Sequence, residues 1–477
     1  MSRDFEGDSP RIRSAEDVVE VFSSGEKPAG DFRIGAEYEK LPFFLKDGAL
    51  VPYEGGIEKL INGLEACGWR KTGVPPIVSM ERESPSEGDV ESFAKAGTKL
   101  FNASISLEPG GQFELSGAPQ KSMHDVAREL AVHLKEVVEV ADNAGIGLAT
   151  WGFRPFERTD EMVWMPKDRY RIMREHLGPR GRGGLEMMLL SGTVQANLDF
   201  ASERDMADKM RAAMAVSPVV AAMFANSPFE FGRWGGQRSR RYAMWRDVDR
   251  ARTGILPFVF ENDFGYRDYI EWALDVPLVF LRREGDYIPV GDITFRQYME
   301  RGWKDEVANL TDFENHISVL FPEVRLKRFI ETRCGDSVPP GLAVAMIALW
   351  KGLIYDPEAL RDITGLFAGF SMPEREALRI AAAQDALLAR GPTFDLGELA
   401  IEVLRIADRG LKTAGLKDAK GRDESHWLAP LKPIVTSKRT LADAAVHKYG
   451  AGPWNAQQKL QILSDNAYSH HQLNELV

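Results

Sequence analysis

Hydrophobic and polar residues alternate along several segments in the first two thirds of the chain. The first such segment begins near residue 32, and its apolar positions are Phe32, Ile34, Ala36 and Tyr38. Glu37 and Glu39 lie between them and therefore share the opposite face. This period of two predicts a β-strand that turns one face toward a hydrophobic core.

Three further segments are predicted to be extended. Residues 104–116 alternate in the same way, with an interruption at Pro109-Gly110-Gly111, where the glycines permit a tight bend. A third segment places Gln195 and Asn197 on one face. A weaker alternation follows near residue 331. Together these segments predict a sheet with one polar face.

Residues spaced three and four apart predict helices between and after the strands. Ser122, with Asp125 three residues later, opens a helical pattern that ends at Gly145. A second helix is predicted where methionines recur at 206, 210 and 214, and we interpret that stripe as core packing. After residue 335 the chain consists of helical patterns separated by glycine and proline.

These patterns predict an α+β protein with three regions. Residues 1–30 form an N-terminal arm, residues 31–335 an α+β region and residues 336–477 a helical C-terminal region. The glycine- and proline-rich residues 335–341 are predicted to be the linker between the last two.

The charge balance and the cysteine content narrow the class of protein. The 477 residues carry 60 Lys and Arg against 71 Asp and Glu, a net charge of −11, which disfavours binding to a nucleic acid. The two cysteines cannot form a disulfide framework. The charged start is no secretory signal, and the apolar run 342–350 is too short to span a membrane. We therefore expect a soluble cytoplasmic protein.

Several common catalytic motifs are absent from the sequence. It has no Gly-Lys dipeptide and so no Walker-type phosphate loop, and it has neither G-x-G-x-x-G nor G-x-S-x-G. The eight histidines include no H-x-x-x-H pair. Rossmann dehydrogenases, α/β-hydrolases and zinc peptidases are therefore disfavoured.

The polar faces of the predicted strands are rich in carboxylates and amides. Their residues are Glu37, Glu39, Glu108, Gln112, Glu114, Thr193, Gln195, Asn197, Glu331 and Arg333. For any one strand a solvated face explains such a pattern. Taken together, the polar faces indicate a bound cation, because two carboxylates ~4 Å apart repel by about 4 kcal/mol at an effective dielectric constant of ~20. Oxygen ligands of this kind suit Mg²⁺, which proteins commonly hold together with substrate phosphates. The hypothesis is a nucleotide bound through magnesium on an open sheet.

A second feature is an arginine-rich stretch between residues 233 and 252. Its members are Arg233, Arg238, Arg240, Arg241, Arg246, Arg250 and Arg252. In an acidic chain it indicates a pocket for small anions such as carboxylate or phosphate. The alternative is structural ion pairing, for example with Asp247 and Asp249, and we expect it for about half of these arginines.

Long blocks of the sequence resemble the glutamate–cysteine ligase family, in the branch shared by plants and proteobacteria. The resemblance covers roughly residues 31 to 360. Its blocks are residues 35–39, 106–119, 193–200, 225–229, 252–260 and 321–328.

The resemblance implies a fold and an activity. The fold would be an antiparallel curved sheet similar to that of glutamine synthetase, with flanking helices, and residues 31–335 would be the catalytic region. The activity would be ATP-dependent joining of the γ-carboxylate of L-glutamate to the amino group of L-cysteine, through a γ-glutamyl phosphate, in the first step of glutathione biosynthesis. The small-molecule partners would be ATP, both amino acids and Mg²⁺, with glutathione as a possible feedback ligand and a monomer or homodimer as the assembly.

The resemblance also implies roles for individual residues. The metal ligands would be Glu37, Glu39, Glu108, Glu114, Gln195 and Glu331. Glu331 and Arg333 would be catalytic. Arg241 and Arg252 would bind the substrate, and Gln112, Asn197 and Arg333 would bind the nucleotide.

Three alternatives remain open at this point. A ligase of the same fold could use a different amine acceptor. A guanidino kinase could share the sheet architecture and transfer a phosphoryl group without forming an amide. A metal- or nucleotide-binding protein without turnover belongs to a different class.

Overall fold

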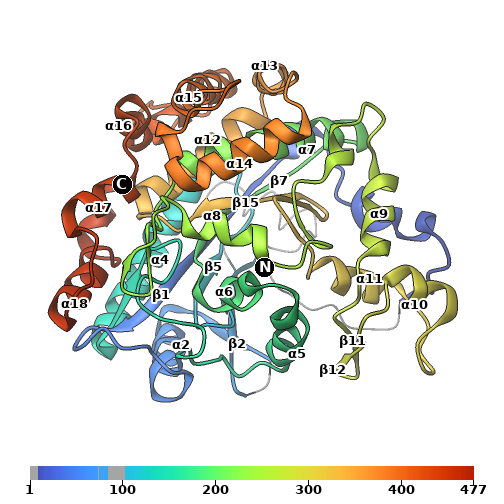
Figure 1. Cartoon of the computed structure of the whole chain (residues 1–477), viewed down its shortest axis with the longest axis horizontal. Helices are drawn as coiled ribbons and strands as arrows, with labels where there is room; N and C mark the ends of the chain where they lie inside the picture. The colour runs from blue at the N-terminus through green and yellow to red at the C-terminus, as the bar shows by residue number, and fades with distance from the viewer. Residues whose placement is uncertain (1–8, 74, 84–101, 477) are drawn as a thin grey trace.

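A nine-stranded sheet forms the centre of the molecule (Figure 1). The structure is a computed structural model that describes residues 9–73, 75–83 and 102–476. Eight strands follow the order β14-β15-β7-β1-β5-β4-β3-β2, β6 pairs with the end of β1, and every neighbour in this sheet is antiparallel. The strands are β1 (Ile34–Phe44), β2 (Arg70–Thr72), β3 (Ser79–Glu83), β4 (Asn102–Leu107), β5 (Phe113–Ser116), β6 (Ile146–Ala149), β7 (Thr193–Leu198), β14 (Val324–Leu326) and β15 (Ile330–Asp336). The predicted α+β class with an antiparallel sheet is confirmed.

The alternation along β1 sorts its side chains onto two faces. Ile34, Ala36 and Tyr38 are at most 2% exposed and belong to the main hydrophobic core. Glu37 and Glu39 point to the other face, where they too are buried. The break predicted at residues 109–111 is the turn between β4 and β5.

Three long helices pack against the sheet: α4 (Met123–Ala144), α7 (Glu203–Met223) and α12 (Pro340–Ile354). α4 begins where the Ser122 hydroxyl accepts a hydrogen bond from the Asp125 amide, and it ends at Gly145 with φ 69°. All residues of α12 are buried, as expected of a helix that is apolar on every side. The three methionines in α7 are fully buried, which confirms their packing role.

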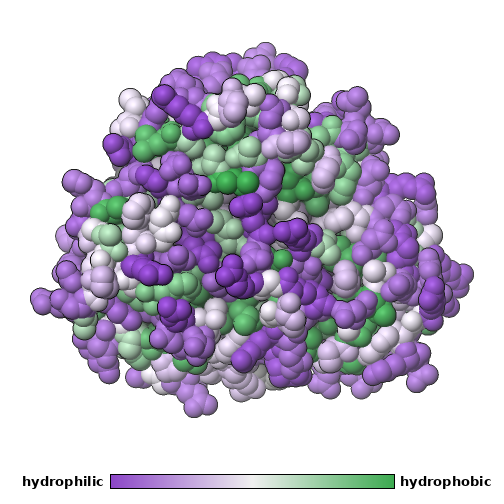
Figure 2. Space-filling view, viewed as in Figure 1, coloured by the Kyte–Doolittle hydropathy of each residue, from purple (hydrophilic) through white to green (hydrophobic). Residues whose placement is uncertain are grey.

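The remaining helices lie around this centre (Figure 1). Before the last strand these are α1 (Val19–Ser23), α2 (Glu58–Leu64), α5 (Asp168–Leu177), α6 (Arg182–Leu190), α8 (Arg240–Met244), α9 (Tyr266–Asp275), α10 (Phe295–Arg301) and α11 (Leu310–Ile317). After α12 come α13 (Pro357–Leu366), α14 (Met372–Asp385), α15 (Leu396–Ala414), α16 (Lys432–Ser437), α17 (Leu441–Tyr449) and α18 (Ala456–Asp465). Figure 2, drawn from the same viewpoint as Figure 1, shows a mostly hydrophilic surface on this side of the molecule. None of the helices in the described residues has the length and apolarity to span a bilayer.

Among the described residues, three two-stranded pairings lie outside the main sheet. They are β8 (Phe229–Glu230) with β9 (Arg233–Trp234), β10 (Thr253–Gly254) with β13 (Phe321–Pro322), and β11 (Phe280–Arg283) with β12 (Asp286–Pro289). The pairing of β10 with β13 is parallel. Residues 253–254, which follow the arginine-rich stretch, therefore lie beside residues 321–322, which precede the β14–β15 hairpin.

The segment predicted to be a linker lies inside the protein. Residues 335–341 complete β15 and start α12, and Asp336, Ser337 and Val338 are at most 1% exposed. The glycines and prolines of this segment therefore turn the chain within the core. In the N-terminal arm, residues 1–8 lie outside the described part, while Val18 and Phe22 are fully buried. The division into three regions stays a proposal about organisation.

A buried ion pair attaches the helical C-terminal region to the rest. Glu424, which is 0% exposed, accepts hydrogen bonds from Lys351 Nζ at 2.7 and 2.8 Å. Its Oε1 also accepts one from the backbone N–H of Met123 at 2.6 Å, at the start of α4. One carboxylate thus joins α4, α12 and the segment after α15.

Replacing Lys351 by methionine should destabilise the protein by about 3–5 kcal/mol, because the Glu424 charge would stay buried without its cation. Chemical denaturation measures this free energy of unfolding. The double variant Lys351→Met/Glu424→Gln is the matched control, and it should be clearly more stable than the single variant. Equal stability of the two variants would contradict the assigned role of the pair.

Candidate functional site

The polar face of the sheet collects carboxylates and amides from four strands. Glu37 lies opposite Gln195 of β7 on one side and Ser116 of β5 on the other. Glu39 lies opposite Glu114. On the far side of β7, Glu331 of β15 lies opposite Asn197. Because residues opposite each other in antiparallel strands share a face, the predicted acidic residues of separate strands do come together.

Short hydrogen bonds order this cluster. Asn197 Nδ2 donates to Glu37 Oε1 at 3.0 Å. A Cβ atom at Gly35 would lie 3.1 Å from Cβ of Asn197, so the glycine leaves space for this amide. On β5, Glu114 accepts hydrogen bonds from the hydroxyls of Ser116 at 2.6 Å and Ser106 at 3.3 Å.

The carboxylates repel one another in a buried environment. Burial, together with the neighbouring charges of Glu114 and Glu108, raises the pKa of Glu39 well above its usual range. Burial and the charges of Glu37 and Glu108 also raise the pKa of Glu114, to about 7. Both shifts show that negative charge is disfavoured at these two positions unless a cation compensates it.

Glu331 has a different environment, because three cations surround it. Arg325 binds both of its carboxylate oxygens, the closest contact being 2.6 Å, and Lys327 Nζ lies 2.6 Å from Oε2. Arg333 donates to Oε1 as well. Burial acts in the opposite direction, but these cations hold the pKa of Glu331 well below its usual value. Glu331 must give up at least one of these partners before it can ligate a metal ion.

Sequence reasoning missed Arg325 and Lys327. Arg325 lies opposite Glu331 in the β14–β15 hairpin, so recognition of a tight hairpin at residues 324–332 would have paired them. Lys327 lies in the turn of the same hairpin, where no alternation rule applies. Arg333, which was predicted, also donates to Gln195 Oε1 at 3.0 Å and so connects β15 with β7.

Arg241 reaches the edge of the cluster from α8. It donates one hydrogen bond from Nη2 to the carbonyl of Arg333 at 2.9 Å. Its Nε and Nη1 are buried and have no hydrogen-bond partner among the described residues. The charge of Arg241 acts to lower the pKa of Glu39, but burial and the neighbouring carboxylates still hold that pKa well above its usual range. The two open donors are suited to an anionic ligand.

Asp336 fixes the position of Arg241. Its carboxylate accepts hydrogen bonds from the hydroxyls of Ser227 at 2.7 Å and Ser239 at 2.9 Å. The Ser227 hydroxyl accepts the backbone N–H of Arg241 at 3.2 Å, and that of Ser239 accepts the backbone N–H of Tyr242 at 3.1 Å. The end of β15 thus holds the start of α8.

The structure does not bring Arg252 to this face. Its guanidinium group, 0% exposed, binds Asp249 at 2.7 Å and the carbonyls of Pro277 and Val319 at 3.0 and 3.3 Å. Its Nη2 also contacts His176 Nε2 at 2.8 Å, and this position away from the acidic face corrects its prediction as a substrate-binding residue. Other arginines of the stretch form structural ion pairs as well: Arg238, Arg240 and Arg246.

Gln112 also has a structural role in place of the predicted contact with a nucleotide. Its side-chain oxygen accepts the backbone N–H of Gly110 at 2.9 Å, and its amide nitrogen donates to the carbonyls of Met188 and Ser191 at 3.1 and 3.0 Å. Both amide hydrogens are therefore used to hold the bend after β4. Glu108 stays near the acidic cluster, half-buried at the same bend.

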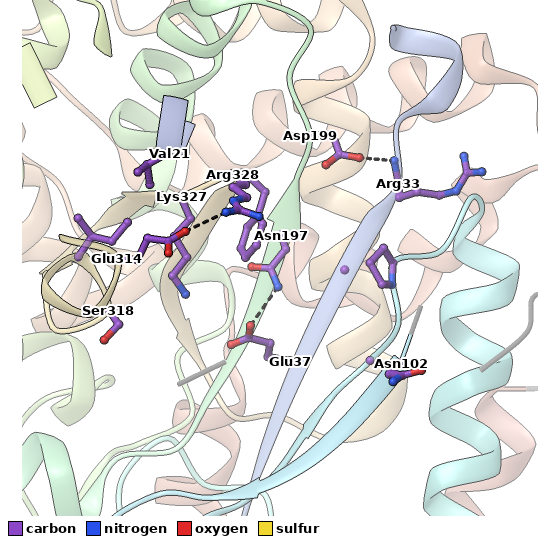
Figure 3. Close-up of a pocket in the computed structure, with 15 residues that line it drawn as sticks. Val21, Arg33, Glu37, Asn102, Asn197, Asp199, Glu314, Ser318, Lys327 and Arg328 are labelled. Carbon is purple, nitrogen blue, oxygen red and sulfur yellow. Dashed lines mark hydrogen bonds and ion pairs between the residues drawn. The ribbon is translucent and has the colours of Figure 1, made fainter. Parts of the chain in front are cut away.

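A cavity of about 310 Å³ adjoins Glu37 and Asn197 (Figure 3). Cations from the turn of the β14–β15 hairpin, Lys327 and Arg328, stand at its wall, and Arg328 pairs with Glu314 at 2.8 Å. Apolar lining comes from Val21, Pro119, Ile317 and Phe329. The cavity offers an apolar space next to cations and to the acidic cluster, which is the combination that a nucleotide base with its phosphates needs.

Comparisons with known proteins indicate one family. The family model of glutamate–cysteine ligase family 2 matches residues 33–459. The chloroplastic glutamate–cysteine ligases of Arabidopsis thaliana and Brassica juncea are both 39% identical to this chain, over 443 and 442 residues. Each alignment covers 92% of this chain, and they cover 80% and 81% of those proteins. Ligase B of Oryza sativa subsp. japonica, also chloroplastic, is 38% identical over 438 residues, which are 91% of this chain and 84% of that protein.

One predicted property is contradicted by these relatives. The sequence was expected to belong to a cytoplasmic protein, whereas the names of all three relatives place those enzymes in the chloroplast. The expectation of a cytoplasmic location is therefore withdrawn.

The fold has a counterpart among solved structures. The glutamate–cysteine ligase of Francisella tularensis, solved in complex with AMP, superimposes with a TM-score of 0.54 at 12% identity, covering 94% of this chain and 92% of that one. That likeness concerns the fold. The family match over most of the chain and the three relatives lead to one conclusion: this protein belongs to the glutamate–cysteine ligase family.

Proposed function

We propose that the protein joins the γ-carboxylate of L-glutamate to the amino group of L-cysteine with hydrolysis of ATP, the first step of glutathione biosynthesis. The relatives named above are glutamate–cysteine ligases. The structural observation that carries the proposal is the set of buried carboxylates Glu37, Glu39 and Glu114 on one sheet face, with an apolar cavity and cations beside them.

Magnesium fits the residues of this face. The donor set consists of carboxylate and amide oxygens, which hard cations prefer, and the described part of the face has no cysteine or histidine among these donors. Glu37, Glu39, Glu108, Glu114 and Gln195 would hold the metal ions, and Glu331 would join them after releasing a cation. Bound magnesium would neutralise charge on the transferred phosphoryl group.

ATP would occupy the cavity next to Glu37. Its base would contact Ile317 and Phe329, and its phosphates would extend toward Lys327, Arg333 and the acidic cluster. The three cations around Glu331 support this orientation, because they can exchange the carboxylate for phosphate oxygens without a loss of charge balance. Asn197 lines the cavity and binds Glu37 of the cluster, which supports its proposed contact with the nucleotide.

The reaction follows from the chemistry of the carboxylate, which is a poor acyl donor. An oxygen of the γ-carboxylate attacks the γ-phosphorus of ATP, a new O–P bond forms, and ADP leaves. The cysteine amine then attacks the acyl carbon, and phosphate leaves while the amine loses a proton. Arg333 would stabilise the equatorial oxygens during transfer. Arg241 would bind the α-carboxylate of glutamate with its two open donors.

Some expectations from the sequence stay predictions. They concern feedback by glutathione and assembly as a monomer or homodimer. An assay of phosphate release with glutamate and a panel of amines decides between cysteine and a different amine acceptor. Cysteine should be the preferred amine, and turnover with another amine but not with cysteine would overturn the proposed acceptor.

Replacing Glu37 by glutamine should lower ADP formation on the order of 100-fold, because the substitution removes a charged ligand from the phosphoryl-transfer site. In the wild type, ADP formation should require both glutamate and Mg²⁺. The matched control is Glu398→Gln on the exposed face of α15, which should keep wild-type turnover. Undiminished ATP turnover in the Glu37 variant would show that the metal site lies elsewhere.

The two arginines should respond differently to replacement by lysine. Arg241→Lys should raise KM for glutamate by about tenfold with little change in stability, because a bidentate carboxylate contact is lost. Arg252→Lys should lower stability by about 2 kcal/mol or more and leave KM unchanged, because its partners are all protein groups. Steady-state kinetics and thermal unfolding separate the outcomes. A raised KM in the Arg252 variant alone would reverse the assignment.

Magnesium binding should release protons near neutral pH and tighten as the pH rises. Glu114 has its pKa raised to about 7 by burial, and Glu39 is raised too, so the metal must displace their protons. The same shifts predict that the metal-free protein loses stability as pH rises from about 4.5 to 7, because the folded state holds more protons there than the unfolded state. Calorimetric Mg²⁺ titration in two buffers of different ionisation enthalpy counts the protons. The Glu114→Gln variant should release fewer protons when it binds Mg²⁺. Binding of Mg²⁺ by the wild type without proton release would contradict the link between metal binding and these raised pKa values.

A further inference from the structure

A histidine pair lies away from the acidic face, where the C-terminal region meets α4. His124 is the second residue of α4, and His426 lies in the 3₁₀-helix Glu424–Leu431. Asp418 belongs to the loop that precedes this 3₁₀-helix. One potential ligand atom of each residue lies within 4.8 Å of those of the other two, and all three residues are half-buried. The proposed reaction uses none of them.

The hydrogen bonds of His426 leave one ring nitrogen open. Its Nδ1 lies 2.6 Å from the backbone carbonyl of Asp423. A carbonyl only accepts, so Nδ1 carries the proton and Nε2 keeps its lone pair in the neutral ring. That Nε2 is buried and has no hydrogen-bond partner among the described residues.

His124 also contacts a backbone carbonyl, but its second ring nitrogen already has a hydrogen-bond donor. Its Nε2 contacts the carbonyl of Leu416 at 3.3 Å, which leaves Nδ1 as the acceptor. Nδ1 accepts a 3.2 Å hydrogen bond from the indole N–H of Trp427. Each histidine thus donates one N–H to a backbone carbonyl; the lone pair of His426 Nε2 is open, whereas that of His124 Nδ1 accepts the indole N–H. Histidines that ligate metals commonly show this second contact, because it fixes the ring orientation.

Asp418 completes the group with an oxygen ligand. Its carboxylate accepts the backbone N–H of Lys420 at 2.9 Å, the backbone N–H of Arg422 at 2.8 Å and Arg422 Nε at 2.7 Å. A carboxylate offers about four lone-pair directions, so one stays open for a cation. The nearby Arg422 charge limits the affinity that such a site can reach.

We propose that His124, His426 and Asp418 form a Zn²⁺ site that fastens the segment after α15 to the start of α4. Two imidazoles and a carboxylate are a common ligand set for Zn²⁺ and a poor one for Mg²⁺. Water would supply a fourth ligand. The site would reinforce the neighbouring contact in which Glu424 binds Met123 and Lys351.

Binding should be visible through Trp427. Its ring lies 4.4 Å from that of His426, and its indole N–H must leave His124 Nδ1 when a metal takes that lone pair. Zn²⁺ should therefore change tryptophan fluorescence in the wild type and should not do so in Trp427→Phe. The titration is done on the full chain with saturating Mg²⁺, so that the acidic face does not compete for Zn²⁺.

Measurements of Zn²⁺ binding and of thermal stability test the proposed metal ligands. Zn²⁺ titration of the wild type should show one site and a raised Tm. His426→Ala and His124→Ala should each weaken this binding by more than about tenfold while keeping ligase turnover. The matched control His447→Ala changes an exposed histidine of α17 and should bind Zn²⁺ as the wild type does. Circular dichroism confirms that each variant is folded. Equal Zn²⁺ affinity in the His426 and His447 variants, or no Zn²⁺ binding by the wild type, would overturn the proposal.

Discussion

The repulsion among carboxylates on one buried face of the sheet is the constraint on which the rest of the structure depends. Glu39 and Glu114 lie directly opposite each other on neighbouring strands, with Glu37 two residues away on the same face. Two such charges ~4 Å apart repel by about 4 kcal/mol at an effective dielectric constant of ~20. The sheet tolerates them because hydroxyls and amides bind them, because the pKa values of Glu39 and Glu114 rise, and because a cation can neutralise them.

Hydrophobic packing of helices against the opposite face of the sheet offsets the cost of burying these carboxylates. The face opposite the acids is apolar along β1, β7 and β5, and it packs against α4 and α12. α12 in turn contacts α15 and the segment that carries Glu424. The helical C-terminal region is therefore part of the same hydrophobic core as the site, and the chemistry of one face rests on the packing of the other.

The sequence predicted the parts of the site that obey a local rule. Alternation placed Glu37 with Glu39 and Gln195 with Asn197, and the structure keeps each pair on one face. It could not show which arginine turns inward, because that depends on contacts between distant segments. Arg252 is held by groups near residues 277 and 319, whereas Arg241 is positioned through Asp336. Gln112 was misjudged for a similar reason, since its partners lie near residue 190.

The domain boundary was hard to predict for another physical reason. Glycine and proline mark any change of chain direction, whether it lies in solvent or in the core. At residues 335–341 the change of direction is buried, and the burial comes from α12, whose apolar sequence follows it.

Isotope transfer tests most directly whether this face activates a carboxylate by phosphorylation. Glutamate labelled with ¹⁸O in both oxygens of its γ-carboxylate is incubated with ATP, Mg²⁺, cysteine and the wild-type protein, and the phosphate formed is measured by mass spectrometry. Attack of the carboxylate on ATP predicts one ¹⁸O atom in each phosphate released. Phosphate free of ¹⁸O, formed together with the amide, would contradict the account.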